Sequence, residues 1–600
     1  MKQDGKLNFY EGGKVLNFKQ KAAEASMQSF INCYLRETGS GAWGEAECRV
    51  ELSHQKIELI LPVKYRSLTH RHIFHFPLCY KTLESGPLLE LDLLTAGALL
   101  LKELSLEYGD NGGEEEMMQR VLQSFELTEW FLEARKEQKG EIISRYIDSE
   151  QALLLGHLLH PTPKSRQGME REEERNLYSP ETGGRFQLHF FRAPSEQIEE
   201  ASMEKESAAA IVKNELQNAP ETEELFKEDY CRLDDGYALL PVHPLQAEAL
   251  LRKGSIQRKI EQGELAYLGP AGRSFTATSS VRTLYHEQSP YMLKVSIPVK
   301  ITNSLRVNQK KEMARGVEVE KLMRSRIGKE ASQFFPGFEI VRDPAYIALK
   351  GEEETGFETI IRQNPFQETM DDQVSLTAGL VHDAYGEGSM LGNLIRSLAR
   401  AENRSTAEVS RDWFRRYLSI SLHPMLWLYM THGIALEAHQ QNSVVRFTGG
   451  YPQVFYYRDN QGYYFARSKE AHLKEYVPEL NASSDTVCVD DIADERFRYY
   501  FFINHLFGLI NGFGASELIE EAELLRILRE ELKDAEKAFG RSSLTESLLE
   551  QETIPSKGNL LTRFFDMDEL VGSLAEQSVY ILISNPLTEK ECLQHESPAI

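Results

Sequence analysis

The 600-residue chain is short of positive charge. It has 68 Lys and Arg against 92 Asp and Glu, and 68 − 92 gives a formal net charge of −24. This charge repels a nucleic-acid backbone, so no nucleic acid is expected as a partner, and it agrees with a cationic substrate. With 41% apolar residues, the length allows several hydrophobic cores and roughly three or four domains.

Cysteines and long apolar runs are also scarce. The six cysteines include no CxxC pair and no short spacing of a disulfide scaffold, so we expect reduced thiols in a cytoplasm. The first 20 residues contain no apolar stretch of a secretion signal. Residues 417–436 lack Asp, Glu, Lys and Arg, but their apolar residues recur at the spacing of one helix face. This pattern predicts a buried core helix and no membrane contact.

The common nucleotide-binding and catalytic motifs are missing. GxxxxGK[ST], HExxH and GxSxG do not occur. Residues 39–44 match GxGxxG, but a dinucleotide fingerprint needs a strand before it and a helix after it, and here we expect the reverse order. If the protein binds a nucleotide, it must do so with side chains held by a backbone that lacks the common nucleotide-binding motifs.

Local patterns predict mixed helices and strands in the first 150 residues, with helices near 20–36 and 88–104. Short strands follow from about 233 to 347, and mainly helices after about 374. Ser516 is a candidate N-cap for a late helix that Gly540 would end.

One predicted hairpin brings two cations together. Its strands, 278–285 and 291–300, are rich in β-branched and aromatic residues and are separated by a short turn. If Tyr285 pairs with Tyr291, the residues that alternate along each strand divide cleanly between an apolar and a polar face.

On the polar face of that hairpin, Arg282 would lie opposite Lys294 and Ser280 opposite Ser296. Like charges that face each other across a strand pair repel, so the arrangement suggests a bound anion, for which we favour a phosphate. The alternative is a surface strand with two solvated cations.

Two further segments carry groups suited to a phosphate site. In 156–168, prolines force an extended path that can direct His160, Lys164 and Arg166 at an anion. In 435–442, period-2 spacing would place Glu437, His439 and Gln441 on one strand face.

A carboxylate, an imidazole and an amide together suit a hydrated Mg²⁺ and its phosphates, and Asp459 could add a second hard oxygen ligand. Each of these residues, taken singly, is also common in a purely structural role.

The chain as a whole resembles the IucA/IucC family of siderophore synthetases, which work independently of nonribosomal peptide synthetases. The resemblance rests on ordered blocks that cover nearly the whole chain: SFINCYLRETGSG, GHLLHPTPKSRQG, PVHPLQAEALL, TSSVRTLYH, ALEAHQQNSVV, YYRDNQG, FFINHLFGLINGFG and KGNLLTRFFD. It implies a multidomain α+β fold shaped as a cupped hand. The thumb would span 1–148, the fingers, with a central antiparallel sheet, 149–373, and the largely helical palm 374–600.

The resemblance also implies an activity, that of a type A, AMP-forming ligase that uses ATP and Mg²⁺. Such an enzyme adenylates citrate, releases pyrophosphate and joins the citryl group to the primary amine of spermidine, as in petrobactin assembly. A homodimer in the cytoplasm is implied as well. This chemistry needs positioning and charge stabilisation rather than a covalent nucleophile, which agrees with the missing nucleophile motif.

The resemblance assigns site residues by motif. ATP phosphates and citrate carboxylates would be bound by Ser280, Arg282, Thr283, Lys294 and Arg306, with His160, Lys164 and Arg166 nearby. Glu437 and Asp459 would bind Mg²⁺; His439 and Asn442 would contact nucleotide or citrate, with Gln441 beside them; Thr302, Lys557 and Arg563 would complete the citrate pocket. Of these, Arg282, Lys294, Arg306 and His439 are the expected catalytic residues.

Other functions stay open. A related synthetase could use another amine or carboxylate. A Mg-ATP phosphotransferase would use similar groups but leave ADP, and the missing Gly-rich loop and HRD-type motif count against it. A noncatalytic polyanion-binding protein would need the cations but neither Glu437 nor Asp459.

Overall fold

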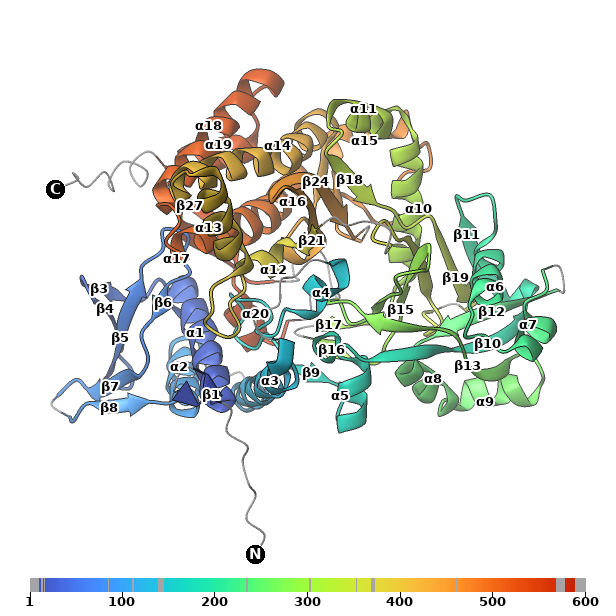
Figure 1. Cartoon of the computed structure of the whole chain (residues 1–600), viewed down its shortest axis with the longest axis horizontal. Coiled ribbons are helices and arrows are strands. Elements are labelled where there is room, and N and C mark those ends of the chain that lie inside the picture. Colours follow the sequence, from blue (N-terminus) through green and yellow to red (C-terminus); the bar gives the residue numbers. More distant parts are fainter. Residues whose placement is uncertain are drawn as a thin grey trace, which may run out of the picture.

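The computed structural model describes most of the chain: residues 10–11, 14–15, 17–84, 86–109, 113–138, 145–233, 236–301, 304–351, 353–367, 373–459, 461–567 and 578–588. Within these ranges, no helix combines the length and apolar character that a membrane span requires. The N-terminal, middle and C-terminal parts lie around the region in which Figure 1 shows the paired strands β9 and β16, with α4, α12 and α20 drawn near them.

The N-terminal part packs three helices against a small sheet. The helices are α1 (Phe18–Thr38), α2 (Leu93–Tyr108) and α3 (Glu114–Ala134). The strands are β3 (Ala42–Trp43), β4 (Glu47–Leu52), β5 (Ile57–Tyr65), β6 (Ile73–Phe74), β7 (Leu78–Thr82) and β8 (Leu89–Leu91); a separate pair, β1 (Tyr10–Glu11) and β2 (Lys14–Val15), precedes them. The helix predicted over 88–104 begins later, because 89–91 pair with β7 and Asp92 caps α2 by accepting from Leu94 N and Thr95 N.

The middle part is built on an eight-stranded sheet in the order β11-β19-β20-β15-β14-β13-β10-β12. Every neighbouring pair is antiparallel, which confirms the predicted central antiparallel sheet. The strands are β10 (Arg185–Pro194), β11 (Ile198–Ser202), β12 (Tyr237–Val242), β13 (Ala266–Ala277), β14 (Thr283–Tyr285), β15 (Tyr291–Val295), β19 (Ala345–Leu349) and β20 (Thr359–Gln363). Helices α6 (Ala208–Asn218), α7 (Glu224–Tyr230), α8 (Pro244–Leu251) and α9 (Gly254–Glu261) accompany this sheet.

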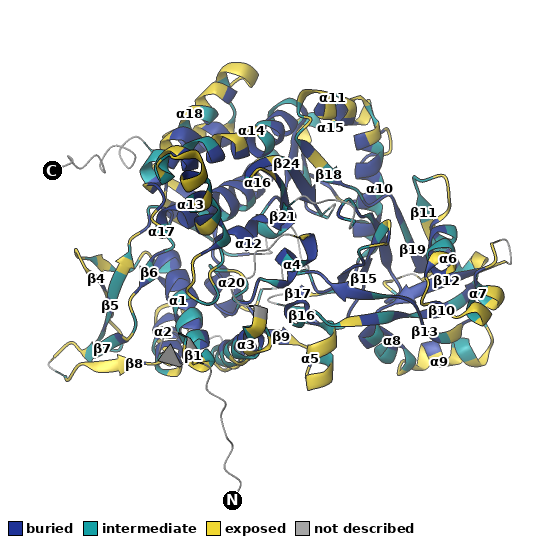
Figure 2. Cartoon of the chain, viewed as in Figure 1, coloured by how far each residue is buried: buried dark blue, intermediate teal, exposed yellow. Residues whose placement is uncertain are grey.

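Shorter elements connect the middle part to the rest of the chain. They are α4 (Tyr146–Gln151), β9 (Arg166–Gln167), α5 (Glu172–Tyr178), β16 (Lys300–Ile301), β17 (Ser304–Leu305), α10 (Lys310–Arg324) and α11 (Arg326–Phe334). Residues along α5 and α9 are mostly exposed, whereas the central strands are mostly buried (Figure 2).

The hairpin register differs from the prediction by one residue. Thr283, not Arg282, pairs with Lys294, and Leu284 pairs with Leu293. The strand predicted from 278 begins only at Thr283, because 278–282 form the tight turn that joins β13 to β14. Val281 adopts a positive φ of 67° in that turn. The predicted apolar face is confirmed, since Leu293, Val295, Ile297 and Val299 all belong to one buried core.

The C-terminal part surrounds the long helix α14 (Thr406–His432), whose Leu418, Leu422 and Met425 are fully buried, as predicted for a core helix. Its other helices are α12 (Thr377–Val381), α13 (Met390–Glu402), α15 (Glu470–Lys474), α16 (Asp490–Phe497), the π-helix η6 (Arg498–Leu506), α17 (Phe507–Ala515), α18 (Glu521–Phe539), α19 (Ser543–Glu550) and α20 (Asn559–Phe564). Its small sheets comprise β18 (Phe338–Val341), β21 (Gln373–Leu376), β22 (Ile434–Leu436), β23 (Ser443–Thr448), β24 (Tyr451–Arg458), β25 (Tyr463–Ala466), β26 (Val487–Cys488), β27 (Thr553–Lys557) and β28 (Tyr580–Ser584).

Contacts cross the predicted domain boundaries. β18 pairs in parallel with β24, and Leu560, Leu561 and Phe564 belong to the N-terminal hydrophobic core. The division at 148 and 373 therefore stays a prediction. The α+β class is confirmed by the mixture of helices and sheets.

Candidate active site

A cavity of about 730 Å³ lies where the three parts meet, with wall residues that range from Arg36 to Ser578. Every predicted site residue lines this cavity except Thr302 and Arg563. Thr302 lies outside the described residues. Arg563 is buried and forms ion pairs with Glu116 at 2.6 Å and Asp566 at 2.5 Å, so its charge is used elsewhere.

The two hairpin cations are both buried in the cavity wall, although they are not directly opposite each other. Arg282 donates to Asn308 Oδ1 and to Gln461 Oε1, each at 3.0 Å. Lys294 donates to Asp459 Oδ1 at 2.9 Å. Ser280 Oγ accepts from Thr283 N at 3.1 Å, which holds the turn that precedes β14.

A second cation, which sequence reasoning missed, flanks Asp459. Arg362 Nη2 lies 3.7 Å from Asp459 Oδ1, and Asp343 accepts from Arg362 at 2.6 and 2.9 Å. Burial alone would raise the pKa of Asp459, but the charges of Lys294 and Arg362 hold it well below its usual range. Burial lowers the pKa of Lys294 to about 8, against the opposing charge of Asp459.

The 156–168 segment delivers its cations to the cavity, but they share a counter-ion that the sequence did not reveal. Glu181 accepts from Arg166 Nη1 at 2.9 Å and also from Lys164. Burial would raise the pKa of Glu181, but Arg166 and Lys164 lower it to about 2. His160 is buried nearby, and its Nδ1 accepts from Thr162 N at 3.1 Å.

The prediction of one strand face for 437–441 is wrong. β22 ends at Leu436, and residues 440–442 form a 3₁₀ turn that His439 caps by accepting from Asn442 N. Glu437, His439 and Gln441 nevertheless all line the cavity, because the irregular backbone directs them there. His439 Nε2 lies 3.8 Å from Glu437 Oε1, and burial lowers the pKa of His439 to about 3, so the imidazole is neutral.

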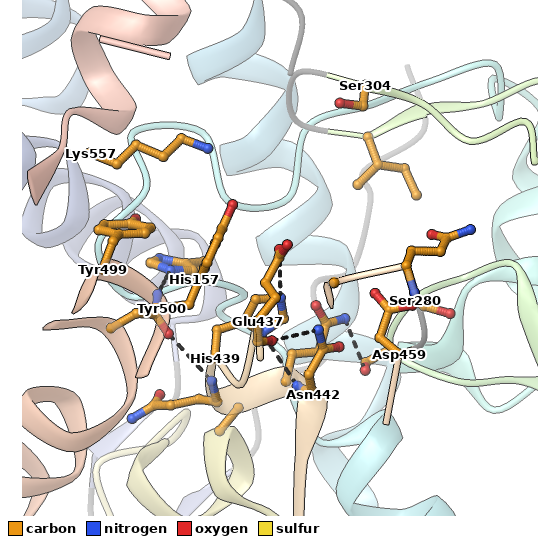
Figure 3. Close-up of a pocket in the computed structure, with 18 of the residues that line it drawn as sticks. His157, Ser280, Ser304, Glu437, His439, Asn442, Asp459, Tyr499, Tyr500 and Lys557 are labelled. Carbon is orange, nitrogen blue, oxygen red and sulfur yellow. Dashed lines mark hydrogen bonds and ion pairs between the residues drawn. The ribbon is translucent and has the colours of Figure 1, made fainter. Parts of the chain in front are cut away.

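Glu437 lies between two sides of the cavity (Figure 3): Ser280 and Asp459 on one side, and Tyr499, Tyr500 and Lys557 on the other. A Cβ at Gly462 would lie 2.4 Å from the Glu437 Cβ, so this close approach requires glycine. Tyr464 donates to Glu437 Oε2 at 2.9 Å.

The residues present fit one Mg²⁺ bound together with phosphates. Burial, and then the charge of Asp459, raise the pKa of Glu437 to about 7, so a cation would stabilise its ionised form. Among the described residues there is no group of three or more His, Cys, Asp or Glu that could bind a metal alone. Mg²⁺ commonly uses only one or two protein carboxylates, with water and phosphate as its other ligands.

Several wall residues were not predicted individually. The π-helix η6 contributes Tyr499, Tyr500 and Asn504, and π-helices occur frequently at functional sites. Asn504 Nδ2 lies 2.6 Å from His157 Nε2. The only sequence signal here was the block FFINHLFGLINGFG, which contains Asn504 and directly follows Tyr499 and Tyr500.

Arg306 and Lys557 complete the predicted cationic wall. Arg306 donates to Ile301 O at 3.4 Å. Lys557 ends β27, and its carbonyl accepts from Arg36 at 3.3 Å. Glu37, next in the chain to Arg36, accepts from Leu560 N and Leu561 N, each at 2.8 Å, so α1 anchors the segment that presents Lys557.

The charge of the cavity wall is opposite in sign to the net charge of the chain. Among its described wall residues, fourteen are Arg or Lys and five are Asp or Glu, whereas the chain has a net charge of −24. The surplus of cations in the wall favours anions in the cavity. The arrangement is therefore suited to bind polyanions such as a nucleoside triphosphate and a polycarboxylate, with Arg groups for bidentate contacts.

Comparison with known proteins agrees with this chemistry. Residues 145–382 match the model of the IucA / IucC family, and 411–572 match that described as ferric iron reductase FhuF-like transporter. The chain is 46% identical to the spermidine-citrate ligase of Bacillus anthracis, over 95% of this chain and 98% of that protein. It is 36% identical to the rhizobactin siderophore biosynthesis protein RhbC of Rhizobium meliloti, over 95% and 98%.

Among solved structures, the ATP-bound aerobactin synthetase IucA of Klebsiella pneumoniae superposes with a TM-score of 0.86 at 26% identity, over 94% of this chain and 99% of that one. The likeness extends over almost the whole fold. With this structural agreement and 46% identity along nearly all of both chains, the protein belongs to the IucA/IucC family and is a ligase.

Proposed function

We propose that this chain is an ATP-dependent, AMP-forming ligase that adenylates citrate and joins the citryl group to the primary amine of spermidine. The observation that carries the proposal is the cationic cavity in an acidic chain. The spermidine-citrate ligase of Bacillus anthracis and the ATP-bound IucA of Klebsiella pneumoniae support it.

In the first step, a citrate carboxylate oxygen attacks the α-phosphorus of ATP, and pyrophosphate leaves. The carboxylate thereby gains a good leaving group. Arg282, Lys294 and Arg306 stabilise the charge that develops on the phosphates, while Ser280, Thr283, Gln441 and Asn442 orient the nucleotide. Lys164 and Arg166 add charge at the same wall, and His160 lies beside them.

Mg²⁺, when bound at Glu437 with Asp459 nearby, supplies charge neutralisation for the phosphates. Lys557 is proposed to contact citrate, and Thr302 stays a prediction for the same pocket. Because Nδ1 of the neutral His439 imidazole accepts from the backbone N–H of Asn442, its Nε2 carries the proton and can donate a hydrogen bond to a bound anion.

In the second step, the amine nitrogen attacks the activated acyl carbon, loses a proton, and AMP leaves. Binding energy is used mainly to position the two reactants, which agrees with a wall of fixed side chains and no covalent nucleophile. The cavity itself is cationic, so the bound citrate carboxylates, rather than the wall, are expected to attract the polyamine.

The product that ATP leaves behind tests this proposal. ATP, citrate and spermidine should yield AMP, pyrophosphate and citryl-spermidine, and hydroxylamine in place of spermidine should give a citryl hydroxamate. ADP without hydroxamate would instead identify a phosphotransferase. If no nucleotide is cleaved, the cavity only binds polyanions.

Substrate competition separates the finer parts of the proposal. If another carboxylic acid replaces citrate, the ligase class stands but the type A assignment fails. If another amine outcompetes spermidine, only the polyamine assignment is lost. We also propose a homodimer, which light scattering on the purified protein can test. A cytoplasmic location stays a prediction.

A further inference from the structure

A buried cluster of hydrogen-bonded side chains lies behind the cavity wall. Its centre is Glu150 in α4, whose side chain is 0% exposed and does not line the cavity. Glu150 Oε2 accepts from Ser279 N at 2.9 Å and from Ser279 Oγ at 2.6 Å. Its two carboxylate oxygens also accept from both terminal nitrogens of Arg458.

The cluster includes a third wall segment. Arg458 Nε and Nη2 donate to Gln441 O at 3.0 and 2.8 Å. Gln441 Nε2 in turn donates to Ser279 Oγ at 3.1 Å. One fully buried carboxylate thus links residues that are 129 and 308 positions away in the sequence.

Each of these three linked residues stands next to a residue of the proposed nucleotide site. Ser279 precedes Ser280, Arg458 precedes Asp459, and Gln441 precedes Asn442. A displacement of any of these segments would move the adjacent site residue by a similar amount.

The same segments adopt backbone conformations that need support. Val281, two residues after Ser279, has a φ of 67°, and Asp459, next to Arg458, has a φ of 118°. Both lie in the region that favours glycine, and Val281 is β-branched, so each conformation persists only when its surroundings fix it. The hydrogen bonds of Glu150 to Ser279 and Arg458 supply that fixation.

We propose that Glu150 is a positioning residue for ATP binding, which acts through Ser279 and Arg458 to hold three wall segments in register. The inference rests on the proposed function, because it takes ATP as the ligand. Glu150 itself contacts no substrate. Its carboxylate is needed because the buried guanidinium of Arg458 requires a charged partner and the Ser279 backbone requires an acceptor.

Glu150→Gln tests the proposal, because it keeps the shape of the side chain and removes its charge. We expect the dissociation constant of ATP, measured by calorimetry, to rise at least tenfold and the rate of citrate-dependent ATP–pyrophosphate exchange to fall about a hundredfold. Glu215→Gln is a matched control, since Glu215 accepts from buried Arg273 at 2.8 Å in the middle part of the chain, away from the cavity. It should lower the melting temperature without changing ATP affinity.

A double-mutant cycle with Ser279→Ala distinguishes positioning from a general loss of stability. If Glu150 acts through Ser279, the effects of the two substitutions on ATP affinity should be strongly less than additive. Additive effects, or wild-type ATP affinity in Glu150→Gln, would overturn the proposal. Should Glu150→Gln fail to fold, Ser279→Ala alone must still weaken ATP binding about tenfold, and unchanged binding would refute it.

The outcome for the wild-type protein separates this inference from the proposed function. If the wild-type protein binds no ATP, the proposed function fails. If it binds ATP and Glu150→Gln binds ATP equally well, the proposed function stands and the role of Glu150 is wrong.

Discussion

Lys294, which is buried, forms an ion pair of 2.9 Å with half-buried Asp459, although the two residues are 165 positions apart in the chain. Arg362, 3.7 Å from the same carboxylate oxygen, gives Asp459 a second cationic neighbour. The hairpin lysine is therefore paired with a carboxylate from the C-terminal part. A triphosphate that contacts Lys294 would compete with Asp459 for it, and Mg²⁺ at Asp459 would compensate that carboxylate.

Removal of either hairpin cation should impair adenylation. Arg282→Ala and Lys294→Ala should each reduce pyrophosphate release roughly a hundredfold, or about 3 kcal/mol, because each removes a charged contact that strengthens in the transition state. Arg252→Ala is a suitable control, since this exposed arginine pairs only with Glu248 among the contacts described. Near wild-type pyrophosphate release by either cavity variant would remove that residue from the site.

Glu437→Gln should weaken Mg-ATP binding while ATP binding in excess EDTA changes little. The substitution removes the carboxylate whose raised pKa, about 7, marks it as a group that needs a cation. Calorimetric titrations with and without Mg²⁺ would measure both affinities, and EDTA should abolish pyrophosphate release by the wild-type protein. Equal Mg-ATP affinities for variant and wild type would exclude Glu437 as a ligand.

The Glu181 cluster should make the protein acid-sensitive. The pKa of Glu181 is lowered from 4.5 to about 2, so its ionised form stabilises the fold above pH 4.5, and this contribution is lost as the pH falls from about 4.5 to about 2. Glu181→Gln should cost about 3 kcal/mol at pH 7, because it leaves two buried cations without their counter-ion.

Urea unfolding of both proteins between pH 7 and pH 3 checks this expectation. The difference in unfolding free energy between wild type and Glu181→Gln should shrink as the pH falls. Glu248→Gln, which alters an exposed carboxylate, should show a constant small difference. If the difference in unfolding free energy between wild type and Glu181→Gln stays constant down to pH 3, Glu181 does not stabilise the fold through its charge.

Lys557→Ala and Arg563→Ala should differ in what they impair. Lys557 lines the cavity, so its removal should raise KM for citrate about tenfold or more. Arg563 pairs with Glu116 and Asp566 outside the cavity, so its removal should lower the melting temperature and leave KM for citrate within about twofold. A large rise in that KM for Arg563→Ala would restore it to the citrate pocket.

Much of the fold could be predicted, because the spacing of apolar residues along the sequence indicates which positions are buried. The apolar alternation of Leu293, Val295 and Ile297 identified the core face of β15 correctly. The register was wrong by one residue, since the turn around Val281 takes a positive φ that no propensity indicates. Likewise, the helix expected after Ser516 begins at Glu521, with Glu520 as its N-cap, while Gly540 ends it as predicted.

The identities of the site residues were predicted better than their arrangement in space. The types of the motif residues indicated anion and metal chemistry, and nearly all of these residues line one cavity. Their counter-ions were not predictable, because Glu181, Arg362 and Glu150 reach the site by long-range contacts that no local pattern encodes. Glu437 and His439 were placed on a strand that in fact ends at Leu436, yet the irregular backbone before the 3₁₀ turn directs them into the same cavity.

The wall of the cavity begins at Arg36 and ends at Ser578. Consequently, a chain truncated after residue 550 has neither Lys557 nor its strand β27, and Arg36 of α1 loses the carbonyl to which it donates there. Such a chain should not cleave ATP.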